Sequence, residues 1–594
     1  RVHDSASWEQ HKQEANRYRG LPWSDYRYYE PILTPSVRDA LAQDEGPLIS
    51  VLVPVYNTDP AWLQAAIDSV RAQWYPHWEL CLVDDCSDRA DTCALLEALD
   101  DSRIRMQRLE TNQHISGASN AALAMARGDY VALLDHDDEL TPDALYRCWQ
   151  VIRDEGAEFV YSDEDKCNEA GVYCEPHFKA DFSPELFHSQ NYLCHLAVLK
   201  RSLVDSVGGF TLGMEGAQDY DLFLKVAEQT ERIIHIPRVL YHWRKVPGST
   251  AMEMGEKSYA QDAGRKALAA AIQRRGLAAT AQSGAWPGTY RVRYAIKGEP
   301  LVSIIVPFRD KPELLDQCLV SILERSTWKN FEIIGVNNGS EQPETRTAMT
   351  NWATRDDRIR FVDFDAPFNY AAINNFAVTE HARGEHVLLL NNDIEVITPD
   401  WIEALLEFSQ QPGVGAVGGL LLFPDETIQH AGVIIGLGGI AGHSHKNMPR
   451  DRAGYKARPH LIQNLCAVTG ACLMVKRSLY EAVGGLDAEA FAVTFNDVDF
   501  GVRLMNHGLR NVYTPFCVAW HHESQSRGYE DTPAKRQRFG SEIQQFRARH
   551  GALLERGDPY YSPNLTLAGE NFRLSKCALA ARARESDLES DTCG

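Results

Sequence analysis

The chain has 594 residues, which is too many for one hydrophobic core, so two large domains or three to four smaller ones are expected. Its formal net charge of −22 argues against binding of nucleic acid or of an anionic lipid surface by charge alone. No run of about 18 apolar residues occurs, so we expect no membrane-spanning helix, and membrane association only peripherally or through a partner. The 13 cysteines are scattered without a CxxC pair, which favours a reducing, cytoplasmic compartment.

The predicted elements form two copies of one α/β pattern, in which short buried strands alternate with helices. The strand LISVLVPVYN starts at Leu48 and its match LVSIIVPFRD at Leu301, and a helical pattern follows each. Later matches keep the same order, so the expected architecture is a duplicated domain with a mostly parallel sheet. The expected divisions are an irregular helical extension (1–46), a first α/β domain (47–250), a helical linker (251–299), a second α/β domain (300–530) and a C-terminal helix and tail (531–594).

Polar clusters follow matching strands in the two copies. They are Asp84–Asp85 and Asp135–Asp138 in the first copy, and Asn337–Asn338 and Asn391–Asp393 in the second. In open α/β sheets ligands bind beyond the carboxyl ends of the strands, so four clusters in matching places predict ligand sites. For any one cluster, the alternative of helix caps and turns stays open.

The segment VALLDHDDEL, from Val131 to Leu140, places three carboxylates directly after a buried strand. Like charges so close together repel, so a positive partner or a solvated turn is expected there. Asp135 and Asp137 flank His136, and alternate side chains of an extended segment point the same way. Two such carboxylates can hold Mg²⁺ or Mn²⁺ with open positions for phosphate oxygens, which would neutralise a diphosphate leaving group.

Taken together, the segments SVLVPVYN, LCLVDD, TNQHISGASNAAL, DHDD and QDYD resemble the family 2 glycosyltransferases with the GT-A fold. The resemblance covers residues 47–245 and, in the second copy, residues 300–530. The segments YPHWELCLVDDCS, YSDEDK, SQNYLCHLAVLKRSLV and YHWRKVPGST are similar to a bacterial branch that builds surface polysaccharides. The segments FNYAAINNFAV, LLLNNDIEV and HHESQSRG are similar to rhamnosyltransferases of that branch.

In the first copy, the resemblance implies a site for the donor nucleotide and a site for a divalent metal ion. The donor site would comprise Val55, Tyr56, Asn57, Gly117 and Asn120, with Asp84 or Asp85 accepting a hydrogen bond from the base. The metal or diphosphate site would comprise Asp135, Asp137 and His242. Asp138 is expected either to contact the donor sugar or to structure its loop. A tight turn and helix caps are the alternative for Gly117, Asn120 and Asp85.

The resemblance further implies that Asp219 is the catalytic base, which deprotonates the acceptor hydroxyl as it attacks the anomeric carbon. The diphosphate would leave from the opposite face, so the configuration would invert. Where the family often has Glu-Asp, this chain has Gln218-Asp219. Asp221 is expected as an acceptor contact or a helix-start charge, and Glu164 and Asp165 as the acceptor groove or a polar hairpin.

The second copy departs from the family pattern. One carboxylate remains in Asn391-Asn392-Asp393, and an amide oxygen is a weaker ligand for a divalent ion. The expected site residues are the metal ligands Asn391, Asp393 and His522 (or its neighbour His521), the donor-binding Pro307, Phe308, Asn338, Asn369, Asn374, Asn375 and Arg527, and the base Asp497. This copy is either active with a looser metal site or a decayed scaffold, and the retained groups favour activity.

We therefore expect a bifunctional, inverting, metal-dependent glycosyltransferase. It would extend a bacterial surface polysaccharide on a lipid-linked glycan at the inner face of the cytoplasmic membrane. The resemblance implies dTDP-rhamnose as a donor for at least the second copy, while UDP-hexoses and UDP-N-acetylhexosamines stay open for the first. Two alternatives remain, a glycosaminoglycan-type synthase that alternates two UDP-sugars and one active domain beside a carbohydrate-binding scaffold. A nucleotidyltransferase is disfavoured, because no Gly-rich basic loop follows either first strand.

Overall fold

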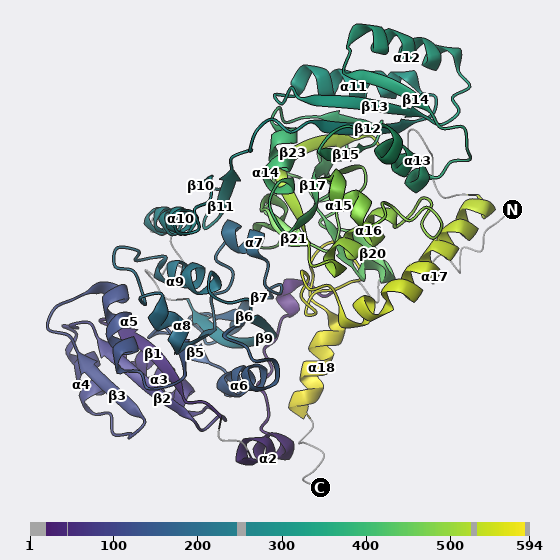
Figure 1. Cartoon of the computed structure of the whole chain (residues 1–594). Helices are drawn as coiled ribbons and strands as arrows, with labels where there is room; N and C mark the ends of the chain where they lie inside the picture. The colour runs from purple at the N-terminus through teal and green to yellow at the C-terminus, as the bar shows by residue number, and fades with distance from the viewer. Residues whose placement is uncertain (1–19, 44–45, 246–256, 524–531, 588–594) are drawn as a thin grey trace.

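The computed structural model describes residues 20–43, 46–245, 257–523 and 532–587. Figure 1 shows two α/β modules, which we call module 1 (residues 46–245) and module 2 (residues 300–523). Among the helices of the described residues, none combines the length and the apolar character that crossing a membrane requires.

Module 1 is built on a nine-stranded mixed sheet of order β3-β2-β1-β4-β8-β6-β9-β5, with β7 paired to β6. Its strands are β1 (Ile49–Val55), β2 (Trp78–Asp84), β3 (Ile104–Arg108), β4 (Tyr130–Leu133), β5 (Glu139–Leu140), β6 (Phe159–Cys167), β7 (Tyr173–His177), β8 (Ala197–Lys200) and β9 (Ile233–Arg244). Its helices are α3 (Pro60–Arg71), α4 (Ala90–Glu97), α5 (His114–Met125), α6 (Ala144–Glu155), α7 (Pro184–Ser189), α8 (Arg201–Ser206) and α9 (Gln218–Ala227). The strands β1 to β4 pair in parallel, so their carboxyl ends meet at one edge.

Module 2 repeats this order strand for strand, as β14-β13-β12-β15-β22-β17-β23-β16, with β18 on β17 and β21 on β23. Its strands are β12 (Val302–Phe308), β13 (Phe331–Asn337), β14 (Ile359–Asp363), β15 (His386–Leu390), β16 (Ile394–Val396), β17 (Val414–Leu422), β18 (Ile428–His430), β21 (Gln463–Leu465), β22 (Cys472–Lys476) and β23 (Arg510–His521). Its helices are α11 (Pro312–Arg325), α12 (Pro343–Arg355), α13 (Tyr370–Phe376), η2 (Ala377–His381), α14 (Trp401–Ser409), α15 (Arg477–Ala482) and α16 (Asn496–Asn506). The predicted tandem α/β class is confirmed, but the sheets are mixed, because β8 and β22 each pair antiparallel with both neighbours.

The duplication extends to buried polar contacts in the first strands. In module 1 the Ser50 hydroxyl donates to Glu79 Oε1 at 2.6 Å, and in module 2 Ser303 donates to Glu332 Oε1 at the same distance. A buried hydroxyl and carboxylate need such partners, because each would otherwise lose its hydration without compensation. Both modules therefore satisfy the buried polar groups of their first two strands with the same hydrogen bond.

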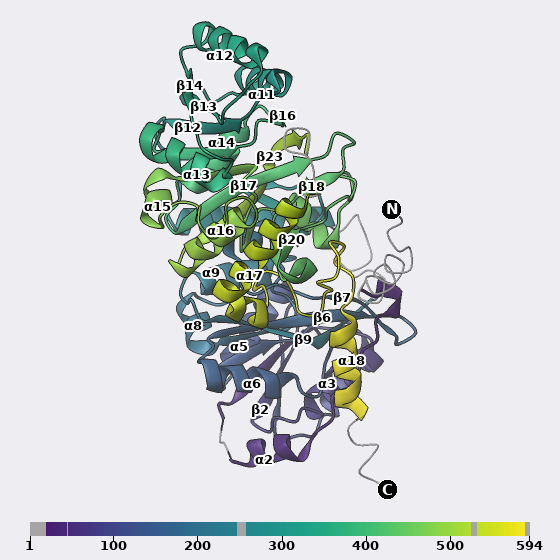
Figure 2. The ribbon, with the colours of Figure 1, turned by 90° about the vertical axis from the view of Figure 1, so that its right-hand side faces the viewer.

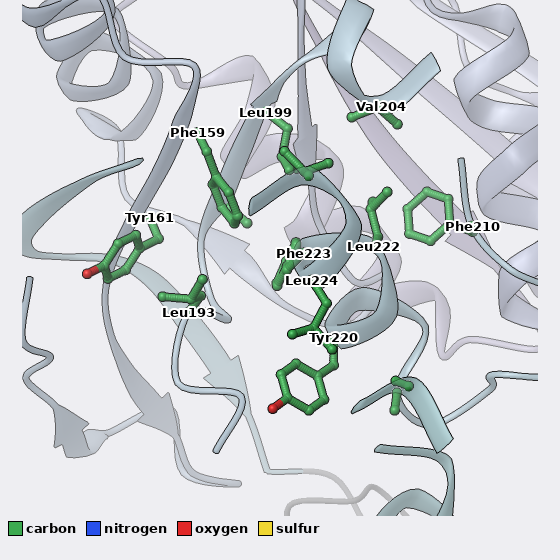
Figure 3. Packing of buried hydrophobic residues seen from close by; sticks show 14 of the residues in the cluster. Phe159, Tyr161, Leu193, Leu199, Val204, Phe210, Tyr220, Leu222, Phe223 and Leu224 are labelled. Atoms are coloured by element: carbon green, nitrogen blue, oxygen red, sulfur yellow. The ribbon is translucent and has the colours of Figure 1, made fainter. Parts of the chain in front are cut away.

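Figure 3 shows how helix α9 is held over the sheet of module 1. Phe223 and Leu224 of the helix belong to the same buried cluster as Phe159 of β6 and Leu199 of β8. The rings of Phe159 and Phe223 lie 5.2 Å apart. Burying each such side chain contributes about 1.5–3 kcal/mol, so the packing fixes the first turn of α9, which carries Asp219.

Several elements outside the two sheets complete the chain. They are η1 (Trp23–Asp25), α2 (Pro35–Gln43), α10 (Lys257–Arg274), the hairpin β10 (Ala279–Ser283) and β11 (Tyr290–Tyr294), α17 (Pro533–Arg556) and α18 (Lys576–Asp587). Module 2 also carries an insertion, residues 424–462, that contains β18, η3 (Leu437–Gly439), η4 (Tyr455–His460), and the pair β19 (Val433–Ile435) and β20 (Ala441–His443).

The C-terminal segment joins the two modules. In Figures 1 and 2 its yellow helices α17 and α18 run from module 2 to module 1. Between them, the Asn564 amide donates to Asp163 Oδ2 of module 1 at 3.0 Å. The modules also touch directly, because the Ser183 hydroxyl donates to Asn464 Oδ1 at 2.9 Å. Part of the predicted C-terminal tail is thus a packed connector.

Candidate functional site

Two adjoining cavities lie beyond the carboxyl ends of β1 and β4 in module 1. The larger, which we call the catalytic cavity, measures about 830 Å³, and its lining includes Asp135, Glu164, Lys166, His195, Asp219 and Trp243. The smaller, which we call the strand-end pocket, measures about 580 Å³ and is lined by Pro54, Val55, Tyr56, Asp85, Asn112, His114, Ile115, Ala118 and His136. Pro54, His114 and Ile115 line both cavities, so the two form one site with two compartments.

The strand-end pocket distinguishes the two adjacent aspartates at the end of β2. Asp85 lines the pocket, and its Oδ1 accepts a hydrogen bond from the Gln113 backbone N–H at 2.6 Å. Asp84 is buried beside it, accepts from the Ser87 N–H at 2.9 Å and lies 3.4 Å from the Arg108 guanidinium. Of the two alternatives for the base contact, Asp85 is therefore the one placed to meet a ligand.

Asn57 shapes a loop beside this pocket and Gly117 lies in the adjoining helix α5, and neither residue lines the pocket. The Asn57 side-chain oxygen accepts backbone N–H groups of Asp88 and Arg89, both at 3.0 Å. Asp310 makes the equivalent pair of bonds in module 2, to Glu341 and Gln342. Gly117 is buried within α5, where an added Cβ would lie 2.5 Å from the Gln113 side chain.

Asn120 corrects the expectation of a donor contact. Its side-chain amide holds the backbone of another segment through two hydrogen bonds, which we call a clamp, and it lines neither cavity. Its Nδ2 donates to Phe210 O at 2.8 Å and its Oδ1 accepts from Phe210 N at 2.9 Å. Gly209 has a φ of +65°, and a Cβ there would lie 2.6 Å from Asn120 Oδ1. The double glycine after α8 therefore permits the clamp, because it supplies both the left-handed conformation and the close approach.

The same clamp recurs in module 2 at Asn375. Its amide donates to Leu486 O at 2.7 Å and accepts from Leu486 N at 2.9 Å, and the Tyr480 hydroxyl donates to the same oxygen at 2.6 Å. With its hydrogen-bonding groups engaged, Asn375 is also corrected from a donor contact to a support of the fold.

Asp135 and Asp138 have different surroundings although both belong to the acidic cluster. Asp135 is half-buried and lines the catalytic cavity, where burial raises the pKa of its carboxyl and the nearby His195 opposes the rise. Asp138 is fully buried, accepts from the Tyr241 hydroxyl at 2.6 Å and from the Arg244 N–H at 2.7 Å. These contacts favour its loop-structuring role. Asp137 lies between them, half-buried, with its Oδ1 3.7 Å from His136 Nδ1.

Asp219 stands at the first turn of α9 and faces the catalytic cavity. Its Oδ2 accepts from Asn191 Nδ2 at 2.9 Å and its Oδ1 from the Tyr220 N–H at 2.7 Å. Two residues later, Asp221 is buried, accepts from the Thr211 hydroxyl at 2.6 Å and pairs with Lys225 at 3.1 Å. Of this acidic pair only Asp219 is free to meet a ligand.

His242 and Asp165 face away from the catalytic cavity, contrary to expectation. Glu164 and Trp243 line the cavity, so their strand neighbours Asp165 and His242 point to the other side of the sheet. There His242 Nδ1 lies 2.5 Å from Asp165 Oδ1, and Asp165 also accepts from the Tyr26 hydroxyl at 2.7 Å. Neither residue can ligate a metal at Asp135 or contact an acceptor in the cavity from this position. Glu164 lines the cavity and is paired with the buried Lys179 at 3.0 Å.

In module 2 the position facing the polar cluster carries a histidine. Glu139 of β5 pairs with His242, and the matching Glu395 of β16 pairs with Trp520, so Trp243 corresponds to His521. His521 Nε2 lies 3.2 Å from Asp393 Oδ1 and 3.4 Å from the Asn391 amide.

The neighbouring His522 turns elsewhere and bonds to Glu395 at 3.1 Å. Of the two alternatives for the late histidine of module 2, the structure brings His521 to the cluster and leaves His522 outside it.

Asp497 occupies the place of Asp219 at the first turn of α16. Its Oδ2 accepts from the Gly470 N–H at 2.7 Å, and burial raises the pKa of its carboxyl. As in module 1, the carboxylate two residues later is structural, because Asp499 is buried with Arg503 at 2.7 Å and His550 at 2.8 Å.

The remaining expected residues of module 2 support the strand ends. Asn338 donates to Phe364 O and Ala366 O, while its Oδ1 is buried without a hydrogen-bond partner among the described residues. That oxygen is an unused acceptor at the position that matches Asp85 of module 1. Pro307 and Phe308 are buried, and Asn369 caps α13 through Ala372. Asn374 donates to Tyr370 O, and its Oδ1, like that of Asn338, is buried without a hydrogen-bond partner among the described residues. Arg527 lies outside the described residues.

His195 is a cavity residue that sequence reasoning missed. Its ring stacks on Tyr241 with centroids 4.6 Å apart and lies edge-on to Trp243 at 5.8 Å. Its place beside Asp135 follows from the packing of β8 against β4, and the segment YLCHLAV offers no local signal for it. Asn191, which orients Asp219, was missed for the same reason.

The polar clusters fit a divalent ion whose remaining ligands come from a bound phosphate group. Within the part of the chain that the structure describes, no group of three or more His, Cys, Asp or Glu side chains is arranged to hold a metal. Asp135 and Asp137 offer carboxylate oxygens, and in module 2 Asp393 lies beside His521, whose Nδ1 is buried without a hydrogen-bond partner among the described residues. Such sets match Mg²⁺ or Mn²⁺ bound jointly by a protein and by phosphate oxygens.

Comparison with known proteins gives matches to both modules. The family described as Glycosyl transferase family 2 matches residues 50–208 and 303–484, more than half of the chain. Uncharacterized protein y4gI of Sinorhizobium fredii is 48% identical over 540 residues, covering 89% of this chain and 59% of that protein. O-antigen biosynthesis protein RfbC of Myxococcus xanthus is 38% identical over 552 residues, covering 92% of this chain and 42% of that protein.

A third relative, Chondroitin synthase of Pasteurella multocida, is 30% identical over 200 residues, covering 33% of this chain and 20% of that protein. The chain spans about half the length of the first two relatives.

Proposed function

The chain belongs to glycosyl transferase family 2, and we propose that each of its modules transfers a sugar from a nucleotide-diphosphate donor to a growing bacterial surface polysaccharide. One observation carries the proposal. In both modules a carboxylate without an ion pair among the described residues, Asp219 or Asp497, lies at the start of a matched helix, while the carboxylate two residues later is held in ion pairs, and Asp219 lines the catalytic cavity.

In module 1 the two compartments suit the two halves of the donor. The strand-end pocket would take the nucleoside, with Asp85 accepting from the base and Tyr56, which is 48% exposed, forming a wall. The sugar would then lie in the catalytic cavity beside Asp135. A divalent ion at Asp135 and Asp137 would supply charge stabilisation to the departing diphosphate.

We propose Asp219 as the base of module 1. Asn191 holds one carboxylate oxygen and the Tyr220 N–H the other, which fixes the orientation without neutralising the charge. The carboxylate would remove the proton of the acceptor hydroxyl as its oxygen attacks the anomeric carbon, and the nucleoside diphosphate would leave from the opposite face. The proposed outcome is transfer with inversion.

Module 2 would run the same reaction with Asp497 as base and Asn338 at the nucleoside. We propose dTDP-rhamnose as its donor, which rests on the segments FNYAAINN and LLLNNDIEV. The likeness to an O-antigen biosynthesis protein supports a lipid-linked glycan acceptor, which would place the chain at the cytoplasmic face of the membrane. A glycosaminoglycan-type synthase is the second candidate, supported by the likeness to a chondroitin synthase over a third of the chain.

The test is direct. The purified chain would be incubated with Mn²⁺ or Mg²⁺, a lipid-linked acceptor and single nucleotide sugars, and release of nucleoside diphosphate and formation of product measured. We expect acceptor-dependent release with dTDP-rhamnose and with at least one further donor. Use of UDP-glucuronate with a UDP-hexosamine instead would support the second candidate, and no release with any donor would overturn both.

A further inference from the structure

A third cavity lies beside the catalytic cavity, at the boundary between the modules. This intermodule cavity measures about 740 Å³, and its lining includes Trp23, Glu175, His445, Lys446, Lys456 and Phe572. Glu175 and Lys456 also line the catalytic cavity, so the two spaces adjoin at these residues. The volume falls in the range of about 300–1,000 Å³ that ligand sites occupy.

Lys456 belongs to module 2, although it lines the catalytic cavity of module 1. It lies in η4 of the insertion, where Gly454, Lys456 and Ala457 have φ values of +66°, +49° and +60°. For residues other than glycine this backbone conformation costs about 1–3 kcal/mol each and persists only where surrounding contacts hold it.

Tyr455 provides the contacts that hold this loop. Its hydroxyl accepts from the Phe178 N–H at 2.8 Å and donates to Phe178 O at 2.9 Å, both on module 1. Its ring lies between Trp23 and Phe572, each stacked with centroids 5.4 Å away. The strained loop is therefore seated firmly on module 1.

The ammonium group of Lys456 differs from its basic neighbours. Lys179 pairs with Glu164 at 3.0 Å and Lys166 with Glu175 at 3.1 Å. Lys456 is half-buried, burial lowers its pKa, and it makes no hydrogen bond or ion pair among the described residues. A partly desolvated ammonium without a partner is costly, and oxygens of a ligand would satisfy it.

The walls of the intermodule cavity combine flat aromatic rings with polar groups. Trp23 is 36% exposed and stacks on Tyr455 at an interplanar angle of 9°. Lys446 and Lys456 add two cationic donors and Glu175 and Glu570 add acceptors. Such a surface presents apolar faces for the ring carbons of a sugar and donors for its hydroxyls.

The insertion that lines this cavity also contacts the loop beside Asp497 of module 2. Lys446 lines the cavity, and His443 of the same segment has its Nδ1 2.7 Å from His430 Nδ1. His430 in turn accepts from the Thr469 N–H at 3.4 Å, next to Gly470, which bonds Asp497. The same insertion of module 2 therefore contributes to the cavity wall and to the surroundings of Asp497.

We propose that the intermodule cavity is a subsite for the growing glycan, which holds the sugars behind the acceptor residue of module 1 and receives Lys456 as a contact from module 2. The inference rests on the proposed function and extends it. Module 2 thereby completes the acceptor site of module 1, and the glycan stays bound at the module boundary between successive transfers.

The test compares short and long acceptors. A fluorescent monosaccharide acceptor and the longest product fraction that the wild-type protein makes from it would be offered to Lys456→Gln and Trp23→Ala. We expect the kcat/KM of module 1 for the long acceptor, relative to its kcat/KM for the monosaccharide, to fall about 10-fold, equivalent to about 1.4 kcal/mol.

The matched control is Lys266→Gln, an exposed lysine of α10 that lines neither cavity. Because Trp23 also packs against Phe178, unfolding curves accompany that variant, and Lys456→Gln stands alone if it unfolds. Equal losses on both acceptors, or no loss, would overturn the inference while leaving the proposed function intact. Absence of any product from the wild-type protein would instead overturn the proposed function, and the inference with it.

Discussion

Modules 1 and 2 share a sheet order but equip the end of the fourth strand differently. Module 1 has Asp135 and Trp243 in one cavity, with Asp137 two residues after Asp135, whereas module 2 has Asn391 and Asp393 beside His521. The module that lost a carboxylate therefore carries an imidazole at the position where the other has an indole. The comparison shows that the possible metal ligands must be counted in the folded structure. The sequence motif of module 2 alone omits His521.

The bases offer the largest expected effect. Asp219→Asn removes the proton acceptor and should lower transfer by module 1 about 10²- to 10⁴-fold, with module 2 unaffected, and Asp497→Asn should do the reverse. Single-donor assays of each variant measure this. Asp219→Asn with full module 1 activity would contradict the role of that residue.

The next largest effect is expected from His521, the histidine that module 2 has in place of Trp243. His521→Ala should lower transfer by module 2 about 10- to 100-fold and raise the Mn²⁺ concentration that it requires. The reason is that the imidazole beside the proposed metal ligands Asn391 and Asp393 is lost. His522→Ala is the matched control, since its ring bonds to Glu395 outside the cluster and should change little. The measurement is initial rate against Mn²⁺ concentration, and equal behaviour of the two variants would remove the distinction drawn here.

The asparagine clamps predict a smaller effect, on stability. Asn120→Ala and Asn375→Ala each leave a buried backbone pair unsatisfied, which should lower the free energy of unfolding by about 1–3 kcal/mol. Asn375→Ala should cost more, because it also orphans the Tyr480 hydroxyl. Urea titrations would show the difference. Wild-type stability with a raised KM for the donor would restore the donor-binding role that the structure argues against.

The smallest expected effect concerns the pH dependence of transfer by module 2. Burial raises the pKa of Asp497, and the base works only when deprotonated, so activity is lost as the pH falls through this raised pKa. The acid limb of kcat/KM for the module 2 donor, measured in Asp219→Asn, should lie above the ordinary aspartate pKa of about 3.9. A limb at or below that value would show that Asp497 is not desolvated.

Sequence reasoning located the tandem fold and the two carboxylates at helix starts, because both depend on local patterns repeated along the chain. It misplaced His242, because the face of a strand depends on register, and the pairing of β6 with β9 shifts register at Ser162 and Asp163. Asn120 resembled a ligand because its true partner, Phe210, lies far along the chain. The position of Lys456 could not be predicted from the sequence, because nothing in its own segment indicates that it lines a cavity of the other module.

The claim that two separate enzymes occupy one chain is tested most directly by the linkages that each module makes. Products of the wild-type protein, Asp219→Asn and Asp497→Asn on one fluorescent acceptor would be isolated and their glycosidic linkages assigned by NMR. The account predicts that the wild-type product contains two linkages and that each variant retains a different one. A single linkage that survives Asp497→Asn and disappears in Asp219→Asn would contradict it and leave module 2 as a scaffold.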